Sequence, residues 1–233
     1  GAPMAVRAPR AAGRPLRVAA GRWTPEVRAA RDRFLAERGK DAPAYDPNRP
    51  PVAVLPWSDA AVAGDPAELV FLRLTTKADF RFNDKWWEII PIIYGRQPAR
   101  AAHEHFISLS SSVWQSQPDY HHYRKAVLAS YIELCRGVGR RECRPYLMRL
   151  WAGWNEKEAV DYSRQAIDEE KARPVGIELV PAEEGDAAPL RVRRGLRMIA
   201  EMRDLAVKLR AAGVDVWVVD DLPQPVLSAS AAD

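Results

Sequence analysis

Carboxylate side chains follow the two stretches of this chain that look most like buried strands. Asp59 and Asp65 come soon after the apolar run 52–55, and Asp220 directly follows the run 214–219. Open α/β sheets keep their chemistry in the loops just beyond the carboxyl ends of their strands. A carboxylate in such a loop can attack an electrophile or transfer a proton. These two turns are therefore the first places to look for a site.

The strands that would position these carboxylates are predicted from apolar runs and their boundaries. Residues 52–55 follow two prolines and stop at Pro56, which is typical of a short strand buried on both faces of a parallel sheet. Apolar residues recur at helical spacing over 196–209, and Gly213 and the apolar run 214–219 follow. Helix, glycine and buried strand form the second half of a right-handed crossover unit. The fold class is therefore predicted to be α/β.

The segment between the two strands has the apolar pattern of helices. A helix after Asp65 is expected to use that residue as its cap, and Asn155 with Glu158 resembles a capping box. An earlier helix is predicted from Thr24 to Gly39, with Pro25 at its first position. Further candidate helices span 99–109, 120–135, 140–151 and 156–172.

An all-helical run between two strands of one sheet predicts a cap domain inserted into an α/β core. The expected division has four parts: a disordered basic leader at 1–21, an N-terminal helix with the first core strand and the start of the cap at 22–98, a helical cap at 99–173, and a second core segment of helix, strand and helix at 174–233.

The charge of the chain is concentrated at its start. The formal net charge of the 233 residues is +4, and five arginines precede the first acidic residue, Glu26, so the remainder is close to neutral. We therefore expect a solvated leader and no nucleic-acid partner. No apolar run approaches the roughly 20 residues of a membrane-spanning helix, so a soluble protein is expected, with the cytoplasm slightly favoured over the periplasm or secretion.

The two cysteines, Cys135 and Cys143, lie eight residues apart in a segment predicted to be helical. Eight helical residues rise about 12 Å, which is too far for a disulfide unless 137–139 break the helix and fold the chain back. Free thiols are the prediction, and the redox compartment stays open.

Aromatic side chains are concentrated in the predicted cap, and the chain has eight tryptophans. Such rings can surround an organic cation by cation–π attraction, or they can pack a small helical domain or a subunit interface. The histidines at 103, 105, 121 and 122 are not spaced to chelate on a helix, so no metal site is expected. The candidate ligand-binding residues are Trp86, Trp87, Tyr94, Trp151 and Trp154.

Several segments in a fixed order resemble the haloacid dehalogenase (HAD) superfamily, in the branch that includes the phosphoserine and phosphorylcholine phosphatases. The resemblance covers about residues 30–233. It is carried by 38–41, the strand 52–55, Gly64-Asp65, 166–170, 201–204, 213–219 and 223–226.

This resemblance implies a partial Rossmann-like HAD core with an inserted α-helical cap. In the family, one Asp attacks phosphorus, a second Asp two residues later acts as acid and base, and a Ser or Thr after the second strand binds the phosphoryl oxygens. Those positions fall here on Pro56, Ser58 and Asp220. The third and fourth motifs, which supply a Lys or Arg and hold Mg²⁺, are expected beyond residue 233.

Pro56, Ser58 and Asp220 lack the chemistry of the motif, and we call them the degenerate positions. They predict a pseudophosphatase with no catalytic residue. Such a protein would serve as a non-catalytic binding or structural subunit and would need no cofactor. A core of two strands leaves unpaired edges, so either further strands of this chain complete the sheet, or a protein partner or a second copy does so. Two alternatives stay open. One is a Mg²⁺-dependent phosphomonoesterase that needs a partner, with Asp59 or Asp65 as the fallback catalytic residue. The other is a binding module for a cationic small molecule.

Overall fold

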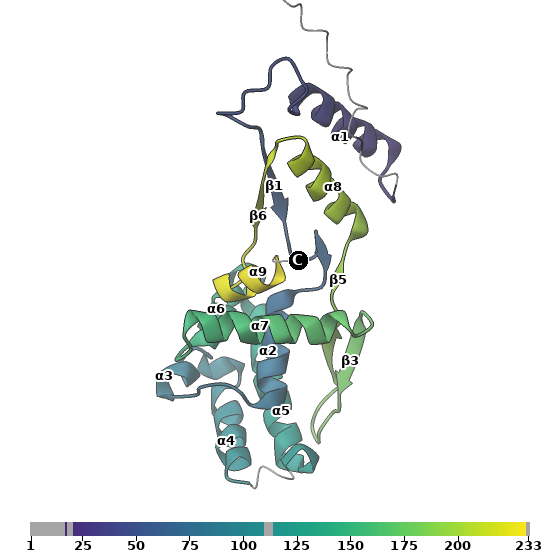
Figure 1. Cartoon of the computed structure of the whole chain (residues 1–233). Coiled ribbons are helices and arrows are strands. Elements are labelled where there is room, and N and C mark those ends of the chain that lie inside the picture. The colour runs from purple at the N-terminus through teal and green to yellow at the C-terminus, as the bar shows by residue number, and fades with distance from the viewer. Residues whose placement is uncertain (1–16, 18–20, 110–113, 232–233) are drawn as a thin grey trace, which may run out of the picture. The chain divides into compact units, whose positions relative to one another are not determined.

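The structure is a computed structural model that describes residues 17, 21–109 and 114–231, and these form two compact units (Figure 1). The strand unit comprises the chain up to Pro56 together with Met198–Val219, and the helical unit comprises Trp57–Arg197 and the chain from Asp220 onward. The leader predicted at 1–21 lies outside the described residues, apart from residues 17 and 21. The units divide the chain at other points than the boundaries predicted after residues 98 and 173.

The strand unit is built on two parallel strands. Strand β1 (Val52–Pro56) pairs in parallel with β6 (Asp215–Val219), and Val54 lies opposite Trp217. Both strands and their parallel pairing confirm the sequence-based prediction. Two helices belong to the same unit: α1 (Pro25–Arg38), which begins with Thr24 as its cap, and α8 (Ala200–Ala211).

The core of the strand unit lies between this sheet and the two helices. Leu35 of α1 packs with Leu205 and Leu209 of α8, and half-buried Ala53, Leu55 and Val216 of the strands pack against them. One face of each strand is thereby covered.

The prediction that these strands are buried on both faces was wrong. Alternate residues of each strand are exposed: Val52 by 57%, Val54 by 59%, Trp217 by 61% and Val219 by 53%. We call these four residues the apolar sheet face. The apolar runs were correctly identified as strands, but the helices of this unit cover only the opposite face.

The helical unit contains the predicted helices with small shifts at their ends. Asp65 caps α2, and Asn155 with Glu158 forms the predicted capping box of α7. The helices are α2 (Pro66–Lys77), α3 (Asp84–Trp87), α4 (Arg96–Ile107), α5 (Pro118–Val138), α6 (Arg140–Met148), α7 (Glu156–Lys171) and α9 (Gln224–Ser230), with 3-10 turns η1 (Ile92–Tyr94), η2 (Trp114–Ser116) and η3 (Arg149–Trp151).

The remaining strands of the structure are short. Strands β3 (Gly176–Val180) and β4 (Leu190–Arg194) form an antiparallel hairpin, and β4 was not predicted. Arg194 anchors the hairpin because it pairs with Glu170 of α7 and with Glu178 of β3. Two strands of two residues each, β2 (Val62–Ala63) and β5 (Arg197–Met198), lie elsewhere in the chain.

The prediction of free thiols was wrong, because Cys135 and Cys143 form a disulfide with their Cα atoms 5.0 Å apart. Helix α5 ends at Val138, and Gly139 has a positive φ of 85° before α6 begins. The glycine therefore breaks the helix and folds the chain back, and this turn brings two cysteines eight residues apart close enough for a disulfide.

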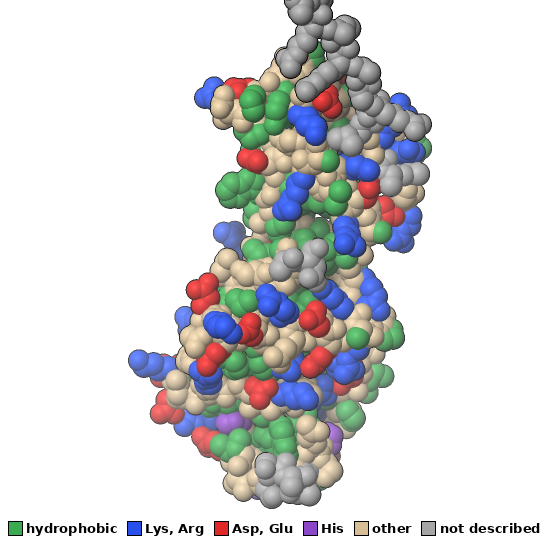
Figure 2. All heavy atoms as spheres, viewed as in Figure 1, with side chains coloured by type: hydrophobic (Ala, Val, Ile, Leu, Met, Phe, Trp, Pro, Cys, Tyr) green, Lys and Arg blue, Asp and Glu red, His purple; other side chains and the backbone are tan. Residues whose placement is uncertain are grey.

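The surface of the helical unit mixes both signs of charge. On the face seen in Figure 2, Lys and Arg side chains lie among Asp and Glu side chains. Ion pairs of the helical unit include Arg73–Glu169 and Arg81–Glu158. Within 21–109 and 114–231, no helix has the length and apolarity needed to cross a bilayer.

Candidate functional site

The turns that carry the predicted carboxylates hold a cluster of arginines and aspartates within the helical unit. Asp59 lies in the turn before α2, Asp65 caps that helix, and Asp221 follows β6. Three arginines reach them: Arg140 and Arg144 of α6, and Arg193 of β4. We call these six residues the arginine–aspartate cluster.

At its centre, the buried carboxylate of Asp65 meets the buried guanidinium of Arg144, with side-chain exposures of 1% and 3%. The Oδ1 atom of Asp65 accepts hydrogen bonds from the backbone N–H groups of Ala67 and Glu68, at 3.0 and 3.2 Å. Its Oδ2 atom accepts from Arg144 and, at 3.0 Å, from Arg140 Nη2. Both oxygens of the carboxylate are therefore fully engaged.

Arg144 also binds the turn after β6, since its Nε lies 3.1 Å from an oxygen of Asp221. Burial opposes the charge of Arg144, but the hydrogen bond and charge of Asp65 outweigh it and raise the pKa of the guanidinium. This arginine is therefore charged at any physiological pH and links two turns that are far apart in the sequence.

Asp59 is held in the same manner at the edge of the cluster. Arg193 donates two hydrogen bonds to its carboxylate, at 2.7 and 3.0 Å, and Gly64 N–H donates a third at 3.2 Å. The hydrogen bond from Arg193 lowers the pKa of Asp59, against the opposing effect of burial. Asp59 has a positive φ of 53°, which places it in the left-handed region.

Two of the three degenerate positions lie together. The backbone N–H of Ser58 donates to Asp220 Oδ2 at 2.5 Å, and the N–H of Asp221 donates to Asp220 Oδ1 at 2.8 Å. The hydroxyl oxygen of Ser58 is buried without a hydrogen-bond partner among the described residues. Pro56 is the last residue of β1, and its side chain has no nucleophilic atom.

The donor set of this cluster does not fit a Mg²⁺ ion. To bind the metal, carboxylates would have to direct their oxygens at it. The carboxylate oxygens of Asp59, Asp65 and Asp221 already accept hydrogen bonds from guanidinium groups, and these positive groups would repel a metal ion placed among them. In the described part of the chain, no group of three or more His, Cys, Asp or Glu residues is placed to hold a metal. The cluster can therefore fix the turns in place, but it presents no free nucleophile.

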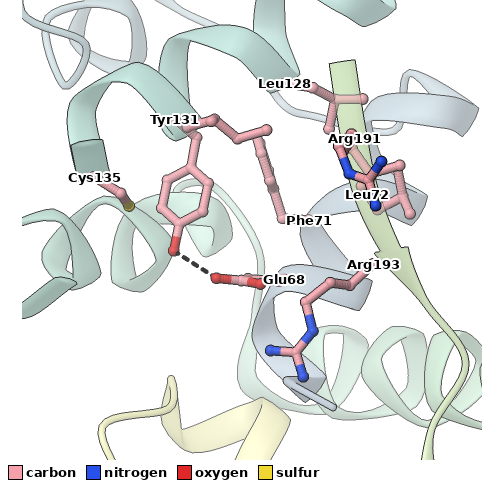
Figure 3. Close-up of a pocket in the computed structure, with 10 residues that line it drawn as sticks. Glu68, Phe71, Leu72, Leu128, Tyr131, Cys135, Arg191 and Arg193 are labelled. Carbon is pink, nitrogen blue, oxygen red and sulfur yellow. Dashed lines mark hydrogen bonds between the residues drawn. The ribbon is translucent and has the colours of Figure 1, made fainter. Parts of the chain in front are cut away.

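A pocket of about 280 Å³ lies beside the cluster, within the same unit (Figure 3). Residues from α2, α5 and β4 line it, and most of its walls are apolar, with Glu68 and two arginines as charged members. The sequence pattern did not predict Glu68, Tyr131 or the arginines of the cluster as site residues. The one available signal was Glu68 at three residues after the cap Asp65, a spacing that also occurs in ordinary helix starts.

The predicted ligand-binding aromatics do not all gather around one cavity, although Trp86 and Trp151 line the same surface pocket. Trp86 and Trp87 are 2% and 4% exposed and pack against Phe82, so their rings are core side chains in this structure. Trp151 and Trp154 are half-buried and meet edge to face at 5.5 Å, and half-buried Tyr94 lies at η1.

Comparison with known proteins shows the fold alone. No family model and no curated protein matches the chain. A solved structure, the crystal structure of a conserved functionally unknown protein from Anaerococcus prevotii, is similar, with a TM-score of 0.77 and 20% sequence identity. The match covers 93% of this chain and 65% of that one, so this chain spans about two thirds of its solved relative. The chain therefore has a helix-rich α/β fold that another protein shares.

Proposed function

We propose that this protein is a pseudophosphatase of the HAD type that works as a non-catalytic binding subunit. The observation that carries the proposal is the arginine–aspartate cluster. At the turns where such an enzyme needs free carboxylates, Asp59 and Asp65 are bound by Arg193, Arg140 and Arg144.

The energetic demand of phosphate-ester hydrolysis supports this proposal. Catalysts of the slowest reactions lower the barrier by about 20 kcal/mol or more. A nucleophile and a metal supply much of that stabilisation in metal-assisted phosphoryl transfer. The position expected for the nucleophile is Pro56, and the position expected for the acid is Ser58. Neither side chain can perform those steps at neutral pH.

The apolar sheet face supports a binding role. Val52, Val54, Trp217 and Val219 are each more than half exposed on two adjacent strands. An apolar strand face with open edges is a surface that proteins normally cover or pair. The occupant expected here is a polypeptide that adds strands or a covering layer, either a protein partner or a second copy of the chain.

The disulfide supports an oxidising compartment for this subunit. Disulfides persist outside the reducing cytosol, and Cys135–Cys143 is closed here. This argument favours the periplasm or secretion over the cytoplasm, which the sequence alone slightly favoured.

The first test measures turnover of p-nitrophenyl phosphate with Mg²⁺ by the full chain and by Asp59→Asn and Asp65→Asn. No turnover above the buffer rate is expected for any of the three proteins. Turnover that both variants retain identifies a contaminant. Turnover that either variant abolishes would overturn the proposal and favour the alternative, a Mg²⁺-dependent phosphomonoesterase.

The second test measures the mass of the same sample by light scattering. Association that Trp217→Lys abolishes and that Val207→Lys leaves intact is expected if the apolar sheet face binds a second copy. Val207 is the matched control, because it is 57% exposed on α8 of the same unit. A monomer that unfolds in one cooperative transition would argue against pairing between copies.

A further inference from the structure

The pocket beside the arginine–aspartate cluster has the features of a small-molecule site. Its volume of about 280 Å³ lies just below the roughly 300 Å³ at which pockets for drug-sized ligands begin, so it suits a smaller molecule. Helix α2 contributes Phe71 and Leu72, and α5 contributes Leu128, Tyr131 and Ile132. These side chains form a mainly apolar wall from two helices that pack against each other.

One carboxylate points into this apolar space. Figure 3 shows the hydroxyl of Tyr131 directed at Glu68, and the distance from Tyr131 Oη to Glu68 Oε1 is 3.4 Å. Burial, followed by the charge of Asp65, raises the pKa of Glu68 against the opposing charges of nearby arginines. No ion pair joins Glu68 to another residue in the described part of the chain.

The charges of the arginine–aspartate cluster beside Glu68 are paired with one another. Each arginine of the cluster already has a carboxylate partner: Arg193 binds Asp59, and Arg140 and Arg144 bind Asp65 and Asp221. Three guanidinium groups of the cluster therefore meet three aspartates, which leaves Glu68 and Arg191 as the charged side chains of the pocket outside these pairs. A cation in the pocket would meet a carboxylate that has no ion-pair partner among the described residues, in a largely buried place where charge pairing is stronger than in water.

Aromatic rings flank the same position. The ring centroids of Phe71 and Tyr131 are 5.4 Å apart in an edge arrangement, and both residues line the pocket. The face of an aromatic ring attracts cations, and apolar walls favour a ligand with a hydrocarbon body. Arg191, at the end of the pocket beside Leu72 and Leu128, disfavours a second positive charge there.

We propose that this pocket binds a small organic ammonium ion with an apolar body, with its charged nitrogen on Glu68 and its hydrocarbon part against Phe71, Tyr131 and Leu128. This inference goes beyond the proposed function, since it needs neither the apolar sheet face nor the absence of catalysis. A negative result here therefore leaves the proposed function standing.

The test titrates the full chain with three probes of nearly equal shape at pH 7.5, and isothermal calorimetry measures the binding. The probes are 3-methylbutylammonium, 3-methylbutan-1-ol and 4-methylpentanoate. Saturable binding of the ammonium is expected, with the alcohol and the carboxylate at least about tenfold weaker, because only the ammonium combines a hydrogen bond to Glu68 with a charge opposite to that of the carboxylate.

Variants then locate the site. Glu68→Gln keeps the shape and removes the charge, and it is expected to weaken ammonium binding at least about tenfold while leaving alcohol binding unchanged. Glu88→Gln, at an exposed glutamate after α3, is the matched control and should bind the ammonium as the natural chain does. Ile132→Phe narrows the pocket from another wall and should weaken all binding that occurs there.

Four results would overturn the inference. They are no binding of the ammonium at millimolar concentration, equal affinity for the alcohol and the ammonium, tighter binding of the carboxylate, and unchanged ammonium binding in Glu68→Gln. Glu68→Gln is expected to fold, because an amide costs less to bury than a carboxylate, and circular dichroism checks this. Should it fail to fold, Ile132→Phe and the three probes still decide the matter.

Discussion

The buried guanidinium of Arg144 forms a salt bridge with the buried carboxylate of Asp65, the residue that also caps α2. Removing one partner of a buried pair leaves an uncompensated charge, which typically costs about 3–5 kcal/mol. Asp65→Asn keeps the capping oxygen, because Asn caps helices as well as Asp does. We expect this variant to lose about 3 kcal/mol of unfolding free energy in urea at pH 7, since Arg144 retains Asp221.

The control for this prediction is the exposed pair Lys157–Asp161 on α7. Asp161→Asn should leave the urea midpoint unchanged, because an exposed ion pair is well solvated in both states. The double variant Asp65→Asn/Arg144→Met should lose less stability than the sum of its single changes. Equal midpoints for Asp65→Asn and Asp161→Asn would show that the buried pair has no special role in stability.

His103 gives the fold a predicted sensitivity to acid. Its imidazole is buried among the rings of Phe82, Trp87 and Tyr123, and burial lowers its pKa to about 4, against a small opposing effect of Glu104. The unfolded chain takes up this proton near pH 6.5, and the folded chain does so only near the lower pKa. The contribution of neutral His103 to the free energy of unfolding should therefore be fully present above about pH 6.5. It should fall as the pH drops toward 4, by roughly 2 kcal/mol after allowance for partial solvent access.

Urea unfolding at several pH values between 4 and 7.5 measures this effect. His103→Phe, which suits an aromatic environment, should remove the part of the acid sensitivity that comes from this residue. The exposed His105, which pairs with Asp119, supplies the control variant His105→Gln. An identical pH profile for the natural chain and His103→Phe would contradict the assignment.

The disulfide predicts a response to reductant. The loop that it closes is short, and for such a loop the chain-entropy model gives about 2–3 kcal/mol of stabilisation. We expect dithiothreitol to lower the melting temperature of the natural chain. The double variant Cys135→Ala/Cys143→Ala should melt at the lower temperature with or without reductant. A natural chain that melts at the same temperature under both conditions would mean that the bond contributes nothing to stability.

The elements of this fold could be predicted from local sequence signals, because those signals act over a few residues. Thr24 with Pro25 marks the start of α1, and Asn155 with Glu158 marks the start of α7. The disulfide could not be predicted with the same security, since it depends on whether Gly139 takes a positive φ. Strand β4 was missed because three arginines in five residues obscure its alternation around buried Val192.

The candidate site was predictable only in part, because its contacts join distant segments. The sequence directed attention to Asp59 and Asp65 through their position after a strand. The partner of Asp59, Arg193, follows 134 residues later, and the partner of Asp65, Arg144, follows 79 residues later. Nothing local marks either arginine as a partner. Burial on one face or two faces of β1 likewise depends on what packs against the sheet, which the run of apolar residues does not specify.

Two adjacent residues of β1 give the last prediction, since they point to opposite faces of the sheet. Leu55 packs against the core of the strand unit, whereas Val54 is 59% exposed. Leu55→Ala should destabilise the isolated chain by about 1–2 kcal/mol, less than a fully buried leucine would, and Val54→Ala should change it by less than about 0.5 kcal/mol. Urea unfolding measures both.

A partner that covers the apolar sheet face changes this ranking, because Val54 then becomes buried in the complex. Val54→Ala should therefore weaken binding of that partner while the isolated chain keeps its stability, and a loss of stability in the isolated chain would mean that Val54 is already covered within it.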